Sequence, residues 1–310
     1  MPTSSIKLLG KKASPLFSII TNTFHSITIE TRATGIVSVV NIDEGKTSPY
    51  GNVVAPGALA QNHQHIFAVR LDPAIDGHAN TITNEESLPI PMNPDTNPHG
   101  NGYEVRSKPI TESSWLDASP FTNLTIKMTN QSKKNPISGK PVAYKFIPTP
   151  SQLILADPRS IPAQRAQFAA HHVWVTSYRD GELWAGGEFT NQSQREIDGV
   201  ADAAARKDNV DDTDVVVWSV FGLTHNPRVE DWPVMPMEKH ELHIRPADFF
   251  TANPALDVPG KKNESSVEIG RCCGGPGNGD AVNGVQEDPV SHMQGTRTLE
   301  VNGNGVNGGH

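Results

Sequence analysis

Hydrophobic and polar positions alternate through many short segments of this chain. Residues 26–32, 152–156 and 172–178 are rich in β-branched or aromatic side chains, and turn-forming spacers separate them. Successive side chains of a strand point to opposite faces, so this pattern predicts half-buried β-strands. No long stretch keeps a 3.6-residue apolar period, and the pattern therefore favours an all-β fold, an antiparallel β-sandwich.

Helices are expected to be few and short. The best candidates are residues 161–170, where Pro162 stands near a first helical position, and residues 203–207. The 26 glycines and 25 prolines of the chain fit many turns between short strands.

A long connector spans residues 81–115. It contains Pro89, Pro91, Pro94, Pro98 and Pro109 and shows little periodicity before Tyr103. A structureless segment of that length is uncommon inside a compact domain. We therefore expect a projecting hairpin arm that contacts a partner surface.

The composition changes at both ends of the chain. From residue 261 onward Gly, Asn, Ser and charged residues dominate, which predicts a disordered tail over residues 261–310. Residues 1–16 form an atypical segment with no pattern that continues the fold. One β domain over residues 17–260 is expected between them.

Charge and apolar content narrow the functional classes. A net charge of −8 argues against nucleic acid or an anionic membrane as the main partner, since both require a basic face. The longest apolar run, residues 215–223, is too short to span a bilayer. The chain start does not resemble a secretory signal, and adjacent Cys272 and Cys273 cannot staple a core. We expect an intracellular protein.

The most informative polar residues are His63 and His65. They are one residue apart on a predicted strand, so both side chains project from the same face. Burying two imidazoles costs free energy unless their nitrogens find partners. A third candidate, His225, lies in a proline-bounded run further along the chain. Together the three predict a metal site with imidazole ligands, for which zinc and copper are both suitable.

The other histidines lack such a setting. Adjacent strand residues face opposite ways, so a neighbouring pair cannot readily share an ion. The residues set aside are the pair His171 and His172, His240 and His243 as surface histidines, and His99 and His310 as solvated ones.

A second site with oxygen ligands is also indicated. Asp72 follows the histidine strand, and Asp214 precedes the strand that leads to His225. With the backbone carbonyls of Pro73 and Val215, these carboxylates suit calcium or a similar cation. The alternative is that both aspartates are ordinary turn and strand-end residues.

Two long motifs resemble the copper-containing primary amine oxidases. They are residues 62–72, which contain Asn62-His63-Gln64-His65-Ile66-Phe67 and Arg70-Leu71-Asp72, and residues 221–236, which contain Thr224-His225-Asn226-Pro227 and Pro233-Val234-Met235-Pro236. Supporting matches occur at residues 32–36, 155–158, 245–250 and 253–259, and the resemblance covers residues 17–259.

The resemblance implies a catalytic β-sandwich domain that is incomplete at its N-terminus. It implies these site residues: His63, His65 and His225 on Cu(II), Asp72, Asp214, Pro73 and Val215 at a peripheral calcium or manganese site, and Met235 near the copper. It also implies a homodimer joined by hairpin arms. The family converts a primary amine, dioxygen and water to aldehyde, ammonia and hydrogen peroxide through topaquinone, a cofactor made from a tyrosine of the chain.

The chain departs from the family at that tyrosine. An Asn-Tyr-Asp/Glu motif is expected shortly before the strand that begins near Phe17, but residues 10–17 contain no tyrosine. The four tyrosines present lie in other contexts, at Tyr50, Tyr103, Tyr144 and Tyr178. The catalytic aspartate, which the family places further upstream, is also absent. We therefore expect no catalytic residue in this chain and no activity from it alone.

Two explanations for the departure remain open. Either the start methionine is misassigned and residues 1–15 replace a true upstream segment, or the chain is a genuine truncated product. The first is favoured because residues 1–15 do not continue the pattern of the fold.

Three functional hypotheses follow. The first is an amine oxidase fragment that binds copper without turnover. The second is a non-catalytic copper-binding or dimerisation module. The third is a chain that does not fold alone, since a sandwich without its outer strands exposes edges and core. The expected compartment is cytoplasm or peroxisome, although the C-terminal Gly308-Gly309-His310 is not the usual peroxisomal tripeptide.

Overall fold

The computed structural model of the chain describes residues 16–21, 25–190 and 193–257. In this part every strand pair is antiparallel, and the strands form three sheets. The seven-stranded sheet has the order β1 (Leu16–Thr21), β2 (Ile27–Ile36), β14 (Val234–Ala247), β11 (Pro141–Phe146), β10 (Thr125–Lys134), β7 (Thr81–Pro89) and β8 (Tyr103–Ile110). The four-stranded sheet has the order β6 (His63–Leu71), β13 (Val215–His225), β12 (Val173–Ser177) and β9 (Ser114–Leu116).

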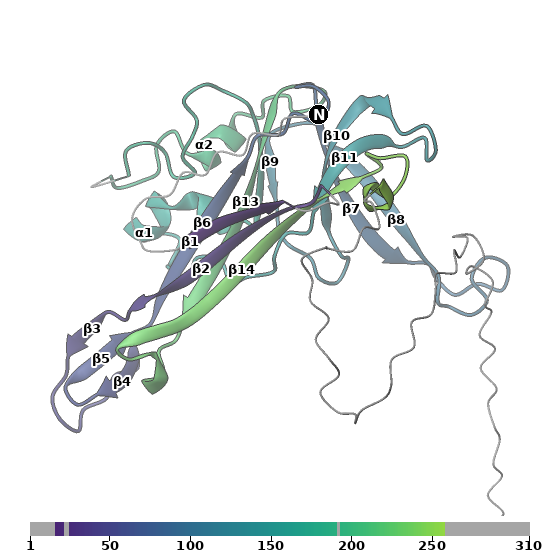
Figure 1. The fold of residues 1–310 in the computed structure, drawn as a ribbon. Helices are drawn as coiled ribbons and strands as arrows, with labels where there is room; N and C mark the ends of the chain where they lie inside the picture. The colour runs from purple at the N-terminus through teal and green to yellow at the C-terminus, as the bar shows by residue number, and fades with distance from the viewer. Residues whose placement is uncertain (1–15, 22–24, 191–192, 258–310) are drawn as a thin grey trace, which may run out of the picture. The chain divides into compact units, whose positions relative to one another are not determined.

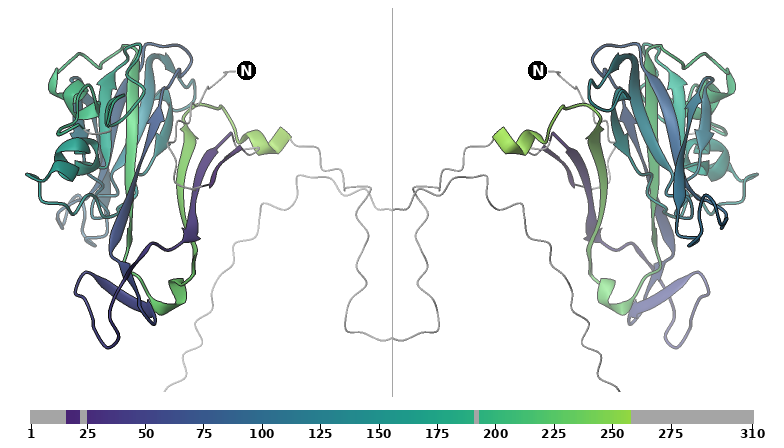
Figure 2. Two further views of the ribbon diagram at one scale, coloured as in Figure 1. Left: turned by 90° about the vertical axis from the view of Figure 1, so that its left-hand side faces the viewer. Right: turned by 90° about the vertical axis from the view of Figure 1, so that its right-hand side faces the viewer.

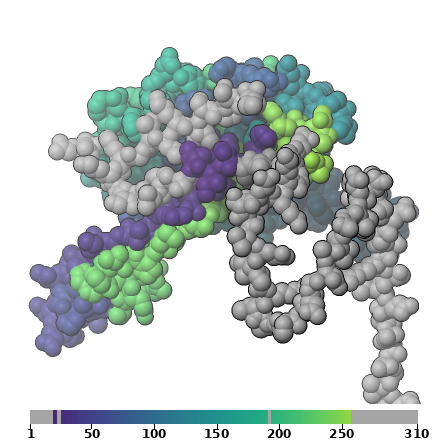
Figure 3. Space-filling view, in the orientation of Figure 1, coloured from purple at the N-terminus to yellow at the C-terminus, as the bar shows by residue number. Residues whose placement is uncertain are grey.

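The third sheet has the order β3 (Val39–Asn41), β5 (Ala58–Gln61) and β4 (Gly51–Ala55). A small core of Val37, Val54 and Ala60 forms there, and Met235 at the start of β14 packs against it. The space-filling view shows the purple β3–β5 region beside the green start of β14 (Figure 3). This contact fixes the chain immediately next to the histidine end of β6.

The two larger sheets share the main hydrophobic core (Figures 1 and 2). Ile29, Ile126 and Phe146 come from the seven-stranded sheet, whereas Val217 and Phe221 come from the four-stranded sheet, and all five are almost fully buried. Two sheets packed face to face through their apolar residues make a sandwich. The predicted all-β fold is therefore confirmed.

The outer face of the four-stranded sheet is covered as well. Trp174, Trp218 and Val220 on that face pack against Val200 and Ala204 of a short helix, α2 (Val200–Ala205). Strand β13 is thus buried on both faces, which explains why residues 215–223 are almost continuously apolar.

The helices are short, as expected. The predicted helix at residues 161–170 is divided into α1 (Ile161–Arg165) and a 3-10 turn η1 (Gln167–Ala170). Ser160 caps α1 because its hydroxyl accepts a hydrogen bond from the Ala163 N–H. The helix predicted at residues 203–207 is α2, which begins three residues earlier. Two further 3-10 turns are η2 (Val229–Asp231) and η3 (Pro254–Asp257). In the described part of the chain no helix is long and apolar enough to cross a membrane.

The predicted strand at residues 152–156 is wrong. This segment lies beside β6, but its backbone bonds the Gln64 side chain and the Ala169 carbonyl, which accepts from the Ile154 N–H at 3.2 Å, in place of a neighbouring strand. The Gln64 amide donates to the Leu153 carbonyl at 3.0 Å and accepts from the Leu155 N–H at 2.9 Å. A side chain that takes the place of a ladder leaves the segment extended but outside the sheet.

The long connector at residues 81–115 is a hairpin for most of its length. Strands β7 and β8 pair from Ile82 with Ile110 to Pro89 with Tyr103. The tip is held by the buried side chain of Asn97, which donates to the Ile90 carbonyl and accepts from the Gly102 N–H. The tail predicted at residues 261–310 and residues 1–15 of the predicted N-terminal segment lie outside the described residues.

Gly222 in β13 permits a close approach that the histidine strands require. A Cβ atom at this position would lie 2.0 Å from the carbonyl oxygen of Gln152, which is a backbone atom and cannot rotate away. We predict that Gly222→Ala lowers the free energy of unfolding by about 3 kcal/mol through overpacking. Denaturant unfolding of the metal-free protein measures this loss.

Gly186→Ala is the matched control, because a Cβ there would meet its nearest atom at 3.4 Å, an ordinary contact. Equal stability of the two variants would contradict the steric role of Gly222.

Candidate metal centre

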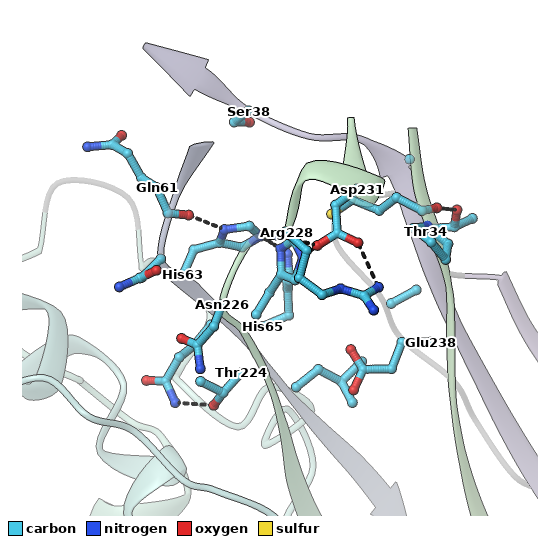
Figure 4. A pocket seen from close by; sticks show the side chains of 18 of the residues that line it. Thr34, Ser38, Gln61, His63, His65, Thr224, Asn226, Arg228, Asp231 and Glu238 are labelled. Carbon is cyan, nitrogen blue, oxygen red and sulfur yellow. Dashed lines mark hydrogen bonds and ion pairs between the residues drawn. The ribbon is translucent and has the colours of Figure 1, made fainter. Parts of the chain in front are cut away.

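The three predicted imidazoles lie at one end of the β6–β13 strand pair. His63 is paired directly with His225, and His65 is paired with Leu223. Because β6 side chains alternate, His63 and His65 share a face (Figure 4). The register of β6 and β13 brings His225 beside them. The sequence thus predicted both the i, i+2 pair and its distant partner.

The rings of His63 and His225 turn one nitrogen toward each other. His63 Nδ1 lies 2.9 Å from the Gln61 carbonyl oxygen, and His225 Nε2 lies 2.8 Å from the Asp231 carboxylate. Each outer nitrogen therefore donates its hydrogen to an acceptor, which leaves the lone pairs on His63 Nε2 and His225 Nδ1. These two atoms are 3.4 Å apart.

That separation fits two ligands of one ion. Metal–nitrogen bonds of about 2.0–2.1 Å in a tetrahedral arrangement hold ligand nitrogens about 3.3–3.4 Å apart. Without a shared cation, two lone pairs at this distance repel each other. An outer hydrogen bond on each ring is also the usual support of a ligating histidine.

His65 completes the group less closely. Its ring centroid is 5.0 Å from that of His63, at an interplanar angle of 88°. Burial lowers the pKa of His65, with further lowering from His63 and His225, so the ring favours the neutral form that binds metals. Within the described ranges, no three His, Cys, Asp or Glu side chains already form a closed set of ligands. In this part of the chain the three rings are therefore neighbours that do not form a closed ligand set.

Asp231 is a functional candidate that the sequence analysis missed. Its side chain is 2% exposed and accepts three hydrogen bonds, from His225 Nε2, from the Arg228 N–H and from the Arg228 guanidinium. The Arg228 side chain is the main reason that the pKa of Asp231 lies far below its usual range. The available signal was a carboxylate six residues after a candidate ligand within a rigid proline-bounded run.

The imidazoles open into a cavity of about 1010 Å³. Met235 and Glu238 of β14 line it together with Tyr50 and Gln64. Met235 therefore borders the same space as the histidines. The charge of Glu238 partly offsets the lowering of the His65 pKa. Tyr50 is 74% exposed at the rim.

The predicted oxygen site lies at the opposite end of the same strand pair. Asp72 follows the last residue of β6, Asp214 precedes the first residue of β13, and Pro73 and Val215 beside them are buried. One oxygen of Asp214, Oδ1, is buried and has no hydrogen-bond partner. Burial, and then the charge of Asp72, raise the pKa of Asp214. Two interacting carboxylates, one with a buried oxygen that has no hydrogen-bond partner, form a site of uncompensated negative charge.

Two expectations about the other histidines are wrong. His171 and His172 do not face opposite ways, because they precede β12 and are not part of it. Their Nδ1 atoms reach the two oxygens of one carboxylate, Asp117, at 3.0 and 3.1 Å. His240 is not a surface histidine, because it lies in β14 and its ring stacks on buried Phe221 at 3.7 Å. Burial lowers the pKa of His240 to about 4.

The remaining histidines agree with expectation where they are described. His243 and His99 are exposed, and His243 bonds the Thr28 hydroxyl. His310 lies outside the described residues.

Comparison with known proteins identifies the family of this chain. A sequence model described as "Copper amine oxidase, enzyme domain" matches residues 18–265. The chain belongs to the copper amine oxidase family. Membership of this family implies copper as the metal, whereas the ligand types alone left both zinc and copper open.

Relatives of this copper amine oxidase chain match most of it. "Copper amine oxidase 1" of Aspergillus niger is 66% identical over 247 residues, which are 80% of this chain and 37% of the relative. "Histamine oxidase" of Arthrobacter globiformis is 39% identical and covers 76% of this chain and 34% of its own length. A copper-containing benzylamine oxidase structure from Hansenula polymorpha superposes with a TM-score of 0.76 at 45% identity, covering 78% of this chain and 38% of that one. The chain spans about a third of the length of these relatives.

The Asp231 carboxylate should govern how stability depends on pH at this centre. Its folded pKa is depressed, so its ionised form stabilises the fold above the unfolded pKa of about 4, and this contribution is lost as the pH falls through the lower folded value. We predict that Asp231→Asn costs about 2 kcal/mol of unfolding free energy near pH 7, with a smaller loss below pH 4.

Denaturant unfolding of metal-free protein between pH 3 and 7 measures the effect. Asp43→Asn removes the same charge from an exposed turn and is the control. A loss for Asp231→Asn that stayed constant over this range would rule out the ionised carboxylate as its source.

Proposed function

We propose that this chain is the copper-holding part of an amine oxidase catalytic domain, with His63, His65 and His225 as the copper ligands. The observation that carries the proposal is the 3.4 Å approach of His63 Nε2 and His225 Nδ1, with both outer ring nitrogens already bonded. Three neutral imidazoles suit Cu(II), and the cavity leaves room for water or dioxygen beside them. Met235 lines the same cavity as the three histidines and would lie near the bound ion.

The residues of the chain have separate roles around the ion. His63 Nδ1 donates a hydrogen bond to the Gln61 carbonyl, and His225 Nε2 donates one to Asp231. Both rings are therefore fixed in the tautomer that leaves a lone pair on the other nitrogen. Asp231 also accepts a hydrogen bond from the Arg228 guanidinium through its other carboxylate oxygen. In the family, bound copper supplies the centre at which dioxygen and a tyrosine yield topaquinone.

The residues present do not fit topaquinone itself. None of the four tyrosines stands in an Asn-Tyr-Asp or Asn-Tyr-Glu motif. Tyr50 borders the copper cavity but is an exposed residue of the turn before β4, and Tyr144 is buried against Phe249 on another sheet. We therefore propose that the chain as given binds copper without oxidising primary amines.

A second cation, calcium or manganese, is proposed for Asp72 and Asp214 with the carbonyls of Pro73 and Val215. The bare, buried Oδ1 of Asp214 supports this assignment, since a carboxylate oxygen in that state needs a positive partner.

The exposed β7–β8 hairpin supports a second candidate function, a dimerisation module. Tyr103 and Val105 of β8 are 69% and 57% exposed, which leaves apolar surface for a partner such as a second copy of the chain. For the compartment we propose cytoplasm or peroxisome, and one relative is named "Peroxisomal primary amine oxidase" of Pichia angusta.

Copper binding is the first test. We predict one Cu(II) per chain in titration calorimetry and metal analysis. His63→Ala and His225→Ala should each weaken binding by more than the about 10–100-fold that loss of an outer-shell partner costs, because each removes a direct ligand. His65→Ala should weaken copper binding as well, because His65 is the proposed third ligand.

His99→Ala is the matched control, since His99 is an exposed residue at the hairpin tip. Unchanged copper content in any of the three site variants would remove that histidine from the ligand set.

Turnover is the second test. We predict that the copper-loaded chain forms no hydrogen peroxide from methylamine, benzylamine or phenylethylamine in air and develops no quinone absorbance. The full-length histamine oxidase of Arthrobacter globiformis, assayed in parallel, is the positive control. Peroxide that appears with copper and disappears in His63→Ala would contradict the proposed inactivity.

A further inference from the structure

We propose that Arg70 is a built-in counter-ion of the Asp72–Asp214 site, which competes with a divalent cation for these carboxylates and sets the cation affinity. The inference rests on the cation site proposed above and concerns its regulation. It is carried by the position of one buried guanidinium group and by the charges around it.

Arg70 is an almost fully buried charge. The residue is 8% exposed, and its guanidinium carbon lies 5.6 Å from the ring centre of Tyr178 and 5.8 Å from that of Trp218. A cation between two aromatic faces is held by their electrostatic quadrupoles. This setting fixes the guanidinium at the end of β6 without polar contacts on most of its surface.

Its hydrogen bonding is incomplete. Arg70 Nη1 donates to Asp72 Oδ2 at 2.8 Å, while Nε and Nη2 are buried without a hydrogen-bond partner. An arginine that satisfies only one carboxylate contact contributes mainly through its charge. Asp214 Oδ1 is likewise buried without a hydrogen-bond partner, although the Asp214 side chain as a whole is 39% exposed.

The charges of Asp72 and Asp214 are only partly compensated by the cationic side chains near them. Asp72 raises the pKa of Asp214, whereas His78 and then Arg70 lower it, so three neighbouring charges act on this carboxylate. His78 Nδ1 is 3.8 Å from Asp214 Oδ2, but its side chain is 76% exposed and its charge is screened by solvent, whereas the Arg70 side chain is 7% exposed. Two carboxylates and one guanidinium leave one uncompensated negative charge. A divalent cation would change that to one excess positive charge.

Arg70 and the cation are therefore alternative partners for the same negative charge. Arg70 stabilises the cation-free protein, and its charge repels an ion that enters beside Asp72. The protein binds the cation more tightly when a neutral residue replaces Arg70. The same replacement removes the counter-ion of the cation-free fold. A role in which Arg70 merely orients Asp72 for the ion predicts the opposite change in affinity.

The experiment compares Arg70→Met, Arg70→Gln and Arg70→Lys with the unchanged chain. Ca²⁺ binding is measured by calorimetry and Tb³⁺ binding by luminescence sensitised through the tyrosines and tryptophans, at fixed pH and ionic strength. Thermal unfolding is recorded in chelator and in excess Ca²⁺. We expect both neutral variants to bind Ca²⁺ about 10-fold more tightly and to melt at lower temperature in chelator, while Arg70→Lys stays within about 3-fold of the unchanged chain.

Weaker or unchanged Ca²⁺ binding in both neutral variants would overturn the proposal. Arg70→Gln retains polar atoms and serves if Arg70→Met does not fold in chelator. The cation site itself is tested separately by Asp214→Asn, with Asp212→Asn, an exposed neighbour, as control. If Asp214→Asn binds Ca²⁺ as tightly as Asp212→Asn, the site is wrong whatever the Arg70 variants do.

Discussion

The antiparallel pairing of β6 with β13 is the interaction on which both candidate sites depend. Its register sets His63 opposite His225 and Leu71 opposite Val217. A slip by one residue would turn every side chain of one strand to the other face. The imidazoles would then separate at one end, and the two aspartates would be displaced at the other, roughly 30 Å away along β6.

The register is fixed by contacts on both faces of β13. One face packs into the sandwich core and the other packs under α2, so a slipped strand would bury polar and expose apolar groups on two sides. Two specific contacts act near the histidines. Gly222 admits the Gln152 carbonyl, and the Gln64 amide bonds both the Thr224 hydroxyl and the Leu153 carbonyl. The side chain between the two β6 histidines therefore anchors the site to a neighbouring segment.

Those parts of the structure that follow from local periodicity were predictable from the sequence. Alternation predicted the sandwich strands, and the i, i+2 spacing put His63 and His65 on one face. His225 was identified through its proline-bounded motif and family resemblance, since spacing alone does not define which distant strands pair. Copper itself came from the family match, because three imidazoles suit more than one metal.

The features that the sequence analysis did not predict all depend on partners that are distant in the sequence. Residues 152–156 have strand composition, but their hydrogen bonds go to the Gln64 side chain and the Ala169 carbonyl and not to a strand. His240 looks like a surface histidine until β14 stacks it on Phe221. Arg70 lies within a recognised motif, yet its burial between Tyr178 and Trp218 appears only when β6, β12 and β13 are assembled.

The same chemical pair, an arginine bonded to an aspartate, has opposite effects at the two ends of β6 and β13. At the proposed copper end, Arg228 bonds Asp231, which in turn accepts a hydrogen bond from His225 Nε2, the ring nitrogen that does not face His63. The pair would therefore strengthen His225 as a ligand. At the other end, Arg70 bonds Asp72, a proposed ligand itself, so its charge opposes the ion directly. Which side of the ligand the arginine occupies decides whether it supports metal binding or limits it.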